Sequence, residues 1–252
     1  MKTKPIAKAR SKERLDLLLV ERGLVGSRDE AARRIMAGEV LVREAVVTKA
    51  GTRVDCTHEV RMKPRASTYA SRGGSKLAGA FQSFEVRVDG RVALDVGAST
   101  GGFTDYLLTQ GTRLVYAVDV GYGQLDWRLR QDPRVVVFEK TNIRYLEPGT
   151  LGEVPDLAVV DVSFISLRLV LPQVQVLLAP QCDIVALIKP QFEVGKGKVG
   201  KGGVVRSDAE HQRVIGEVRS AAAALGLGSR GVVESPLVGP KGNKEFFIHL
   251  QN

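Results

Sequence analysis

The stretch that most constrains the fold is a glycine-rich loop between an apolar strand and a helix. Residues 92–96 read Val-Ala-Leu-Asp-Val, residues 97–102 contain three glycines, and a helix is expected over residues 103–108. A second apolar strand, residues 114–118, is followed directly by Asp119. This order is typical of the first βαβ unit of a nucleotide-binding sheet. There, glycines let the backbone approach the ligand, and the acid after the second strand binds a ribose.

The sequence of the loop favours a cationic ligand over a dinucleotide. It reads Asp95-Val-Gly-Ala-Ser-Thr-Gly-Gly, whereas dinucleotide-binding loops read Gly-x-Gly-x-x-Gly. An acid just before the first glycine repels a pyrophosphate but suits S-adenosylmethionine, which carries a sulfonium and an ammonium group. The loop therefore predicts a methyltransferase that uses S-adenosylmethionine.

Apolar runs continue along the chain and alternate with helical segments. Further strands are expected at residues 135–138, 157–160, 184–188 and 246–250, and a long helix is expected to begin after Ser207. This alternation predicts an α/β fold class, with a mostly parallel, Rossmann-like sheet that has helices on both faces. Such sheets bind ligands outside the carboxyl ends of their strands, so the residues that follow each strand are the candidate site residues.

The residues after the first three strands are the candidates for holding the cofactor. The glycine loop is expected to hold the methionine part, Asp119 the ribose hydroxyls, and Asn142 with Ile143 the adenine. The full set of cofactor candidates is Asp95, Gly97, Ser99, Gly101, Gly102, Phe103, Asp119, Val120, Asn142 and Ile143.

The residues after the fourth and fifth strands, Asp161 and Lys189, indicate the chemistry. The Pro-Pro-aromatic motif of exocyclic amine methylation is absent after the fourth strand, and so is the cysteine of ring-carbon methylation. A carboxylate and a lysine suit the deprotonation of a hydroxyl such as the ribose 2′-hydroxyl, provided that burial or a neighbouring cation favours the neutral amine. Lys76 could supply that cation, and Asp161 and Glu245 could orient the pair. The plainer alternatives are a phosphate contact for Lys76, a helix cap for Asp161 and a pair with Lys244 or Lys241 for Glu245.

Positive charge is concentrated in the first quarter of the chain. The chain has a formal net charge of +9, and residues 1–65 hold 16 Lys/Arg against 9 Asp/Glu, a net of +7. This distribution predicts a separate nucleic-acid-binding module. Cys56 and Cys182 are far apart and the three histidines are isolated, which predicts no metal site and a reducing compartment. Neither a secretion signal nor a membrane-length apolar run is found, so the expected location is the cytoplasm.

The first 60 residues read as two short helices followed by small strands. Helices are expected over residues 14–21 and 28–37, the second behind the capping box Ser27–Glu30, and strands over residues 40–42, 45–47 and 59–62. These elements resemble the αL RNA-binding module first known from a ribosomal protein. The resemblance implies that five residues face RNA: Arg14, Ser27, Arg28, Arg33 and Arg34. The alternative for each arginine is an exposed charge on the surface of a helix. The expected domains are residues 1–62 for RNA binding, a linker over 63–67, and a methyltransferase over 68–252.

The remaining motifs resemble a known enzyme family along nearly the whole chain. They are Ser71-Arg-Gly-Gly-Ser-Lys76, Leu94 to Phe103, Asp161-Val-Ser-Phe-Ile-Ser166, Lys189-Pro-Gln-Phe-Glu193 and Gly242-Asn-Lys-Glu245. The domain is similar to FtsJ-type ribose 2′-O-methyltransferases, and the chain to the TlyA (haemolysin A) family, whose members methylate cytidine riboses in RNA of one or both ribosomal subunits. The resemblance implies a Lys-Asp-Lys-Glu tetrad of Lys76, Asp161, Lys189 and Glu245. Lys189 would be the base, Asp161 would orient it, and the other two would hold the substrate ribose.

Two other functions stay open at this point. One is a non-catalytic RNA-binding or ribosome-assembly factor, which has no need of four charged residues in one cleft. The other is a pore-forming haemolysin, which the missing membrane-length segment disfavours. The Gly195–Gly202 stretch has the spacing of a phosphate-binding loop but lacks its final hydroxyl. We interpret it as a basic loop over the RNA entrance, with Lys196, Lys198 and Lys201 as its cations.

Overall fold

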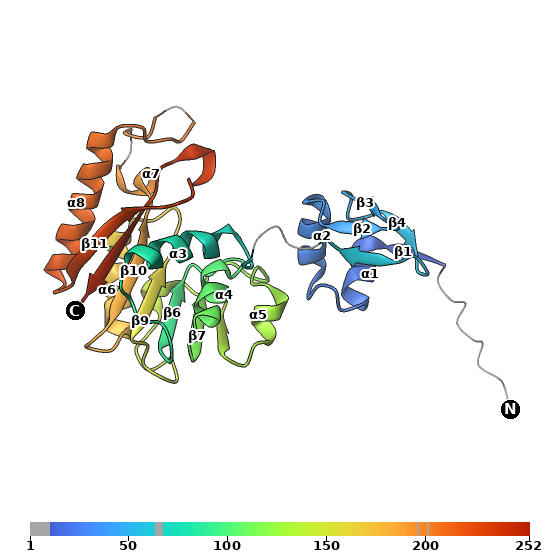
Figure 1. Ribbon diagram of the computed structural model, residues 1–252, viewed down its shortest axis with the longest axis horizontal. Coiled ribbons are helices and arrows are strands. Elements are labelled where there is room, and N and C mark those ends of the chain that lie inside the picture. Colours follow the sequence, from blue (N-terminus) through green and yellow to red (C-terminus); the bar gives the residue numbers. More distant parts are fainter. Residues whose placement is uncertain (1–10, 64–67, 196, 201) are drawn as a thin grey trace. The chain divides into compact units, whose positions relative to one another are not determined.

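The computed structural model describes residues 11–63, 68–195, 197–200 and 202–252 (Figure 1). The chain divides into two compact units, Met1–Ala66 and Ser67–Asn252. The basic arm over residues 1–10 and most of the expected linker, residues 64–67, lie outside the described residues. Each unit is built around its own apolar core, so each can be considered by itself.

The first unit is a small α+β domain. Its elements are β1 (Lys12–Arg14), α1 (Leu15–Glu21), α2 (Arg28–Met36), β2 (Val40–Val42), β3 (Ala45–Val46), β4 (Arg53–Asp55) and β5 (Val60–Met62). Strands β3, β2 and β5 form one antiparallel sheet, and β1 pairs with β4 in another. Leu15, Leu19 and Ile35 bring the two helices together in a core without exposed surface. The hydroxyl of Ser27 caps α2 by accepting the Glu30 amide at 3.1 Å, as the capping box predicts.

The second unit is a seven-stranded sheet. Its strands are β6 (Val92–Val96), β7 (Leu114–Val118), β8 (Val135–Phe138), β9 (Leu157–Val160), β10 (Asp183–Ile188), β11 (Gly228–Glu234) and β12 (Phe246–Gln251). The order across the sheet is β11-β12-β10-β9-β6-β7-β8. The first five strands in sequence are parallel, and β12 is antiparallel to both of its neighbours, β10 and β11, so that β11 runs in the same direction as the first five. The strand order reverses between β6 and β9, and such a switch point is where doubly wound sheets bind ligands.

Helices cover both faces of this sheet (Figure 1). Alternate residues of each central strand point to opposite faces. Ala93 packs with α3 (Arg72–Ser83), α4 (Gly102–Thr109) and α5 (Trp127–Gln131), whereas Leu94 packs with α6 (Leu171–Leu177) and α8 (Asp208–Ala224). The short elements are η1 (Ile143–Tyr145), η2 (Leu167–Leu169), α7 (Pro190–Glu193) and η3 (Pro240–Gly242). The predicted fold class, a Rossmann-like α/β sheet with a small α+β domain before it, is confirmed.

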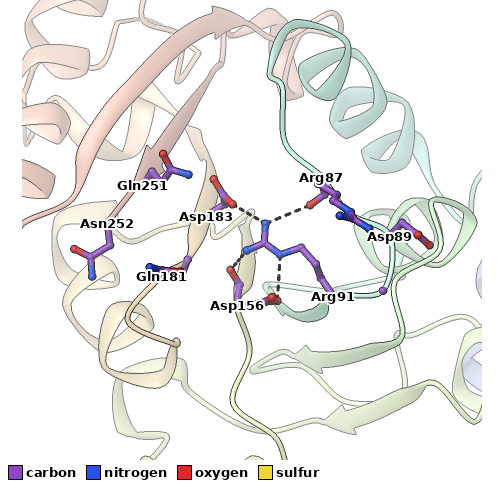
Figure 2. A pocket seen from close by; sticks show the side chains of 10 residues that line it. Arg87, Asp89, Arg91, Asp156, Gln181, Asp183, Gln251 and Asn252 are labelled. Atoms are coloured by element: carbon purple, nitrogen blue, oxygen red, sulfur yellow. Dashed lines mark hydrogen bonds and ion pairs between the residues drawn. The ribbon is translucent and has the colours of Figure 1, made fainter.

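Arg91 links the amino-terminal ends of β6, β9 and β10, at the end of the sheet away from the carboxyl ends of its strands (Figure 2). Its guanidinium lies 2.6 Å from Asp183 Oδ2 and 3.2 Å from Asp156 Oδ1, and it also donates to the carbonyl oxygens of Arg87 and Asp156. The second contact of Asp183 comes from β12, where His249 Nε2 lies 2.7 Å from Asp183 Oδ1. The charged groups at this edge are therefore largely engaged with one another. We interpret the cluster as a structural clasp.

Among the described residues, no helix is both long and apolar enough to cross a bilayer. In the same part of the chain, no group of three or more His, Cys, Asp or Glu side chains has the arrangement of a metal site. Both cysteines are free thiols.

Candidate active site

Two adjoining cavities lie at the carboxyl ends of the central strands. The first, of about 350 Å³, is lined by residues of α3, the glycine loop and the ends of β9 and β10, and we call it the lysine cavity. The second, of about 560 Å³, is lined by residues that follow β7, β8 and β9, and we call it the Asn142 cavity. Gly97 lines both cavities, so they meet at the glycine loop.

The backbone of the loop requires its glycines. Gly97 has φ +87°, and a Cβ there would lie 2.4 Å from the carbonyl oxygen of Asp161. Gly101 has φ +90°, and a Cβ on Gly102 would lie 2.3 Å from the hydroxyl of Ser71. The loop is thus pressed between the end of β9 and the start of α3, which places the two cavities side by side.

The expected ribose and adenine residues gather at the Asn142 cavity. Asp119, Val120, Asn142 and Ile143 all line it. The carboxylate of Asp119 also holds the loop, because Oδ2 accepts the Ser99 amide at 2.9 Å and Oδ1 accepts the Gly121 amide at 2.6 Å. The side chain of Asn142 caps the turn after β8 by accepting the Arg144 amide at 3.1 Å.

Two of the expected cofactor residues line neither cavity. Gly101 is the N-terminal cap of α4, and Asp95 is fully buried beneath the loop, where its Oδ2 accepts the Thr104 hydroxyl at 2.6 Å. Burial disfavours the charged form and raises the pKa of Asp95 to about 7, and the carboxylates of Asp161 and Asp119 act in the same direction. Phe103 lines the lysine cavity, and most of its ring is buried in the core.

The four expected tetrad residues converge on the lysine cavity as two ion pairs. Lys189 Nζ lies 2.6 Å from Asp161 Oδ1, and Lys76 Nζ lies 2.6 Å from Glu245 Oε2. The residues come from α3, from the ends of β9 and β10, and from the residue before β12, so only the tertiary fold unites them. All four side chains are largely buried. The cavity therefore presents two amines and two carboxylates to any group that enters it.

Further polar side chains hold the tetrad and were not expected from the sequence. The hydroxyl of Ser163 lies 2.8 Å from Lys189 Nζ. The buried carboxylate of Glu193 accepts the Ser166 hydroxyl at 2.5 Å and the Leu167 amide at 2.7 Å, which fastens the loop after β9 to α7. Ser163 lies inside the motif Asp161–Ser166, and Glu193 ends the motif Lys189–Glu193. Their position in these motifs is the only signal in the sequence that could have identified them.

Phe164 has a conformation unusual for an aromatic residue. Its φ is +63°, its side chain is 90% exposed, and its ring centroid lies 4.9 Å from that of Phe192. It lines the Asn142 cavity three residues after Asp161. A left-handed backbone costs free energy in a residue other than glycine, and such strain is concentrated at functional sites.

In the small domain, a buried carboxylate organises two of the five expected RNA-binding residues. Arg14 donates to Asp16 through Nε at 2.9 Å and Nη2 at 2.8 Å, and Arg28 Nε lies 2.9 Å from Asp16 Oδ2. The hydrogen bonds from Arg14 hold the pKa of Asp16 well below its ordinary value despite burial. Both guanidinium groups keep part of their surface exposed. Arg34 pairs with Glu30 at 3.1 Å, and the Arg33 side chain is exposed.

Two of the three expected loop cations, Lys196 and Lys201, lie outside the described residues. The third, Lys198, lies 3.5 Å from Glu210 of α8. The proposed role of this loop at an RNA entrance therefore stays a prediction.

Comparison with known proteins places this geometry in a family. The FtsJ-like methyltransferase profile matches residues 69–252, and the S4 domain profile matches residues 13–60. The chain belongs to the FtsJ-like methyltransferase family. It is therefore a methyltransferase, its cofactor is S-adenosylmethionine, and its first domain is an S4 domain.

Relatives of this FtsJ-like methyltransferase match along nearly the whole chain. The 16S/23S rRNA (cytidine-2′-O)-methyltransferase TlyA of Mycobacterium tuberculosis is 49% identical over 94% of this chain and 89% of its own length. Hemolysin A of Brachyspira hyodysenteriae is 38% identical over 94% and 99%. A solved structure from Streptococcus thermophilus, described as a candidate hemolysin, is 43% identical over 97% and 90%, with a TM-score of 0.73.

The residues at and next to the two cavities suit S-adenosylmethionine. Asp119 lines the Asn142 cavity and Asp95 is buried next to the loop; neither forms an ion pair with a described residue, so a cation placed at the loop would complement them. The Asn142 cavity has a volume in the range of small-molecule sites, and the apolar side chains of Val120 and Ile143 contribute to its wall.

Proposed function

We propose that this protein methylates the 2′-hydroxyl of a ribose, on a cytidine, in ribosomal RNA. The observation that carries the proposal is the pair of lysine–carboxylate ion pairs in one cavity, which adjoins a cofactor-sized cavity at Gly97. The Mycobacterium tuberculosis relative, whose name states this reaction, supports the substrate.

Lys189 is the proposed base. Its amine, when neutral, takes the proton of the 2′-hydroxyl, and the resulting ammonium is stabilised by Asp161 at 2.6 Å and Ser163 at 2.8 Å. Asp161 and Ser163 also hold Nζ in place, which removes the orientational freedom of a long side chain. Proton removal makes the 2′-oxygen nucleophilic, and bound S-adenosylmethionine supplies an electrophilic methyl group.

Lys76 and Glu245 are proposed to hold the substrate ribose. Glu245 is fully buried and accepts from Lys76 and, at 3.5 Å, from Gln191, so its position is fixed by two contacts. A ribose that enters the lysine cavity meets the Lys76 amine as a hydrogen-bond donor. The pair thereby positions the 2′-hydroxyl before proton transfer.

The cofactor is proposed to lie across the loop between the two cavities. Asp119 would accept hydrogen bonds from its ribose, Asn142 and Ile143 would contact its adenine, and Gly97 would let the backbone approach it. Ser99, Gly102 and Phe103 line the lysine cavity, on the side where the methionine part would lie.

The S4 domain is proposed to bind ribosomal RNA, free or within ribosomal subunits, mainly through phosphates. Asp16 holds the Arg14 and Arg28 guanidinium groups next to each other, which presents two cations to one stretch of backbone. Phe164, which lines the Asn142 cavity, offers an exposed ring on which a base turned out of its helix could stack. An enzyme with this substrate would act in the cytoplasm, where ribosomes assemble.

The test is to identify the product. The protein is incubated with labelled S-adenosylmethionine and with unmodified small subunits, large subunits or naked ribosomal RNA. The RNA is then digested and its nucleosides are identified by mass. We expect 2′-O-methylcytidine from wild type and at most a trace of it from Lys189→Ala in the same reaction time. RNA binding without any methyl transfer would overturn the proposal in favour of a non-catalytic binding factor.

A further inference from the structure

We propose that Asp95 couples cofactor binding to the release of a proton: it is protonated in the free enzyme and ionises when the positively charged cofactor binds above it. This inference rests on the cofactor site described under the proposed function and adds a pH-dependent step to it. Asp95 acts in this scheme through its charge, from beneath the loop, and touches no reacting atom.

The burial of Asp95 leaves one of its oxygens without a hydrogen-bond donor. The side chain is fully buried at the end of β6, and its Oδ2 accepts a hydrogen bond from the Thr104 hydroxyl at 2.6 Å. Oδ1 has no hydrogen-bond partner among the described residues. An ionised carboxylate with one bare buried oxygen is costly, whereas the protonated acid buries no net charge.

The groups that face Asp95 also favour the protonated acid. Asp119, after β7, and Asp161, after β9, both oppose a further negative charge. The amines of the neighbouring tetrad are engaged elsewhere, Lys189 with Asp161 and Lys76 with Glu245. Thr104 of α4 acts in the opposite direction and favours ionisation through hydrogen bonding. Together these groups leave the pKa of Asp95 at about 7.

A cation at the glycine loop changes this balance. S-adenosylmethionine carries a sulfonium and an ammonium group, and the cofactor site begins two residues after Asp95, at Gly97. A positive charge there lowers the pKa of Asp95, so the carboxyl group loses its proton to solvent as the cofactor binds. The affinity for the cofactor therefore rises as pH increases toward 7, because a smaller fraction of Asp95 is still protonated and has to ionise on binding. Well above pH 7 the affinity no longer depends on this group.

Thr104 sets the pH range over which cofactor binding releases a proton from Asp95. Its hydroxyl donates to the ionised carboxylate, so removing it should raise the pKa of Asp95 and move the window to higher pH. Thr104→Val removes the hydroxyl at nearly constant volume, and Thr104→Ser keeps it. The two variants therefore separate a charge effect from a packing effect.

The experiment is calorimetric titration of the full-length protein with S-adenosylmethionine at pH 6 and pH 8, in buffers with different heats of ionisation. For wild type we expect the titration of Asp95 to release most of one proton per cofactor at pH 6 and little at pH 8, and to weaken binding at pH 6 relative to pH 8. Asp95→Asn cannot ionise, so its proton balance should contain only the titration of the cofactor's own amino group. Thr104→Val should bind more weakly than Thr104→Ser at pH 7, and the gap should close at higher pH.

Three results would contradict the inference, and they are distinguishable. Equal proton release by wild type and Asp95→Asn, with normal binding, would refute the role of Asp95 and leave the cofactor site intact. Failure of wild type to bind S-adenosylmethionine at either pH would refute the cofactor site and the inference with it. S-adenosylhomocysteine, which lacks the sulfonium charge, should release less proton than S-adenosylmethionine. Equal release would likewise contradict the sulfonium part of the argument.

Discussion

Replacing Arg91 by alanine should destabilise the methyltransferase domain far more than replacing Arg113, although each arginine directly precedes a parallel strand. Arg91 bridges Asp156 and the largely buried Asp183 across three strands (Figure 2). Arg113 pairs only with Glu153 among the described residues, and both of those side chains are half exposed. Comparing the stabilities of Arg91→Ala and Arg113→Ala therefore distinguishes a buried ion-pair cluster from a surface ion pair at matched positions.

The loss in free energy of unfolding depends on the buried carboxylate of Asp183, which loses its arginine partner in Arg91→Ala. Removing one partner of a buried ion pair costs about 3–5 kcal/mol, because the other charge stays buried without compensation. Asp183 keeps its contact with His249 at 2.7 Å, so we expect a loss near the lower limit, about 3 kcal/mol. The exposed Arg113–Glu153 pair is screened by water, so its loss should have little effect on stability.

The effect should also depend on pH. Burial opposes ionisation of Asp183, but hydrogen bonds from His249 and Arg91 outweigh it and hold the pKa of Asp183 below its ordinary value. The stabilisation from this group is therefore present at neutral pH and is lost as pH falls through that lowered pKa. The difference between wild type and Arg91→Ala should accordingly be largest near pH 7 and shrink in acid.

Urea unfolding followed by fluorescence provides the assay. The chain has a single tryptophan, Trp127 in α5, so its emission reports on the methyltransferase domain alone. A free energy of unfolding for Arg91→Ala equal to that for Arg113→Ala at pH 7 would refute the clasp. A large loss that stays constant from pH 7 to well below 3.8, the ordinary pKa of an aspartate, would refute the role given to the charge of Asp183.

Three further predictions follow from the two domains. Gly97→Ala should abolish measurable S-adenosylmethionine binding in equilibrium dialysis, because its Cβ would lie 2.4 Å from a carbonyl oxygen; Gly216→Ala, with open space around it, should bind normally. Phe164→Ala should lower methyl transfer to RNA by about ten- to a hundredfold, as expected for one lost stacking contact, and Phe164→Tyr should restore it. Asp16→Asn should weaken RNA binding at least as much as Arg14→Ala and lower the salt dependence of binding, since two guanidinium groups lose their common anchor.

Each of these three predictions has a result that would contradict it. Normal cofactor affinity of Gly97→Ala would mean that the loop can move away from β9. Unchanged transfer by Phe164→Ala would exclude a stacking role for its exposed ring. RNA binding by Asp16→Asn at wild-type strength, in a correctly folded domain, would show that the arginines do not need the carboxylate.

The central strands could be predicted from the sequence, and several flanking elements could not. Residues 92–96 and 114–118 form apolar runs that are buried on both faces, and the structure has β6 and β7 at those bounds. Helix α3 carries three glycines and was not expected. Gly74 and Gly79 let this helix pack closely against Tyr69 and Pro236, a tertiary contact that the local sequence does not reveal.

The short or exposed strands β1, β4 and β11 could not be predicted from the sequence, because they lack a run of apolar residues. β11 begins Gly-Ser-Arg-Gly and is mostly exposed, and a register shift between Ser229 and Gly231 interrupts its pairing with β12. β1 and β4 are three-residue strands that contain one apolar residue between them. Their extended conformation depends on pairing between distant segments, which local composition does not encode.

The site could be predicted as a set of motifs but not as a set of contacts. Motif positions singled out the four residues that converge on the lysine cavity. The partners that hold them, such as Ser163 and Glu193, are polar residues whose role depends on what the fold places next to them. Asp95 shows the same limit, because its place at the end of a strand was predicted but its complete burial beneath the loop was not.

The role of Lys189 as the base is tested by the rate of methyl transfer in a single turnover, measured on the RNA substrate with wild type, Lys189→Ala and Lys189→Arg. We predict that both variants bind S-adenosylmethionine and RNA like wild type but transfer the methyl group at least about a hundredfold more slowly, because neither offers a base. Transfer by Lys189→Ala at close to the wild-type rate would contradict it, since the cavity would then perform the reaction without its proposed base.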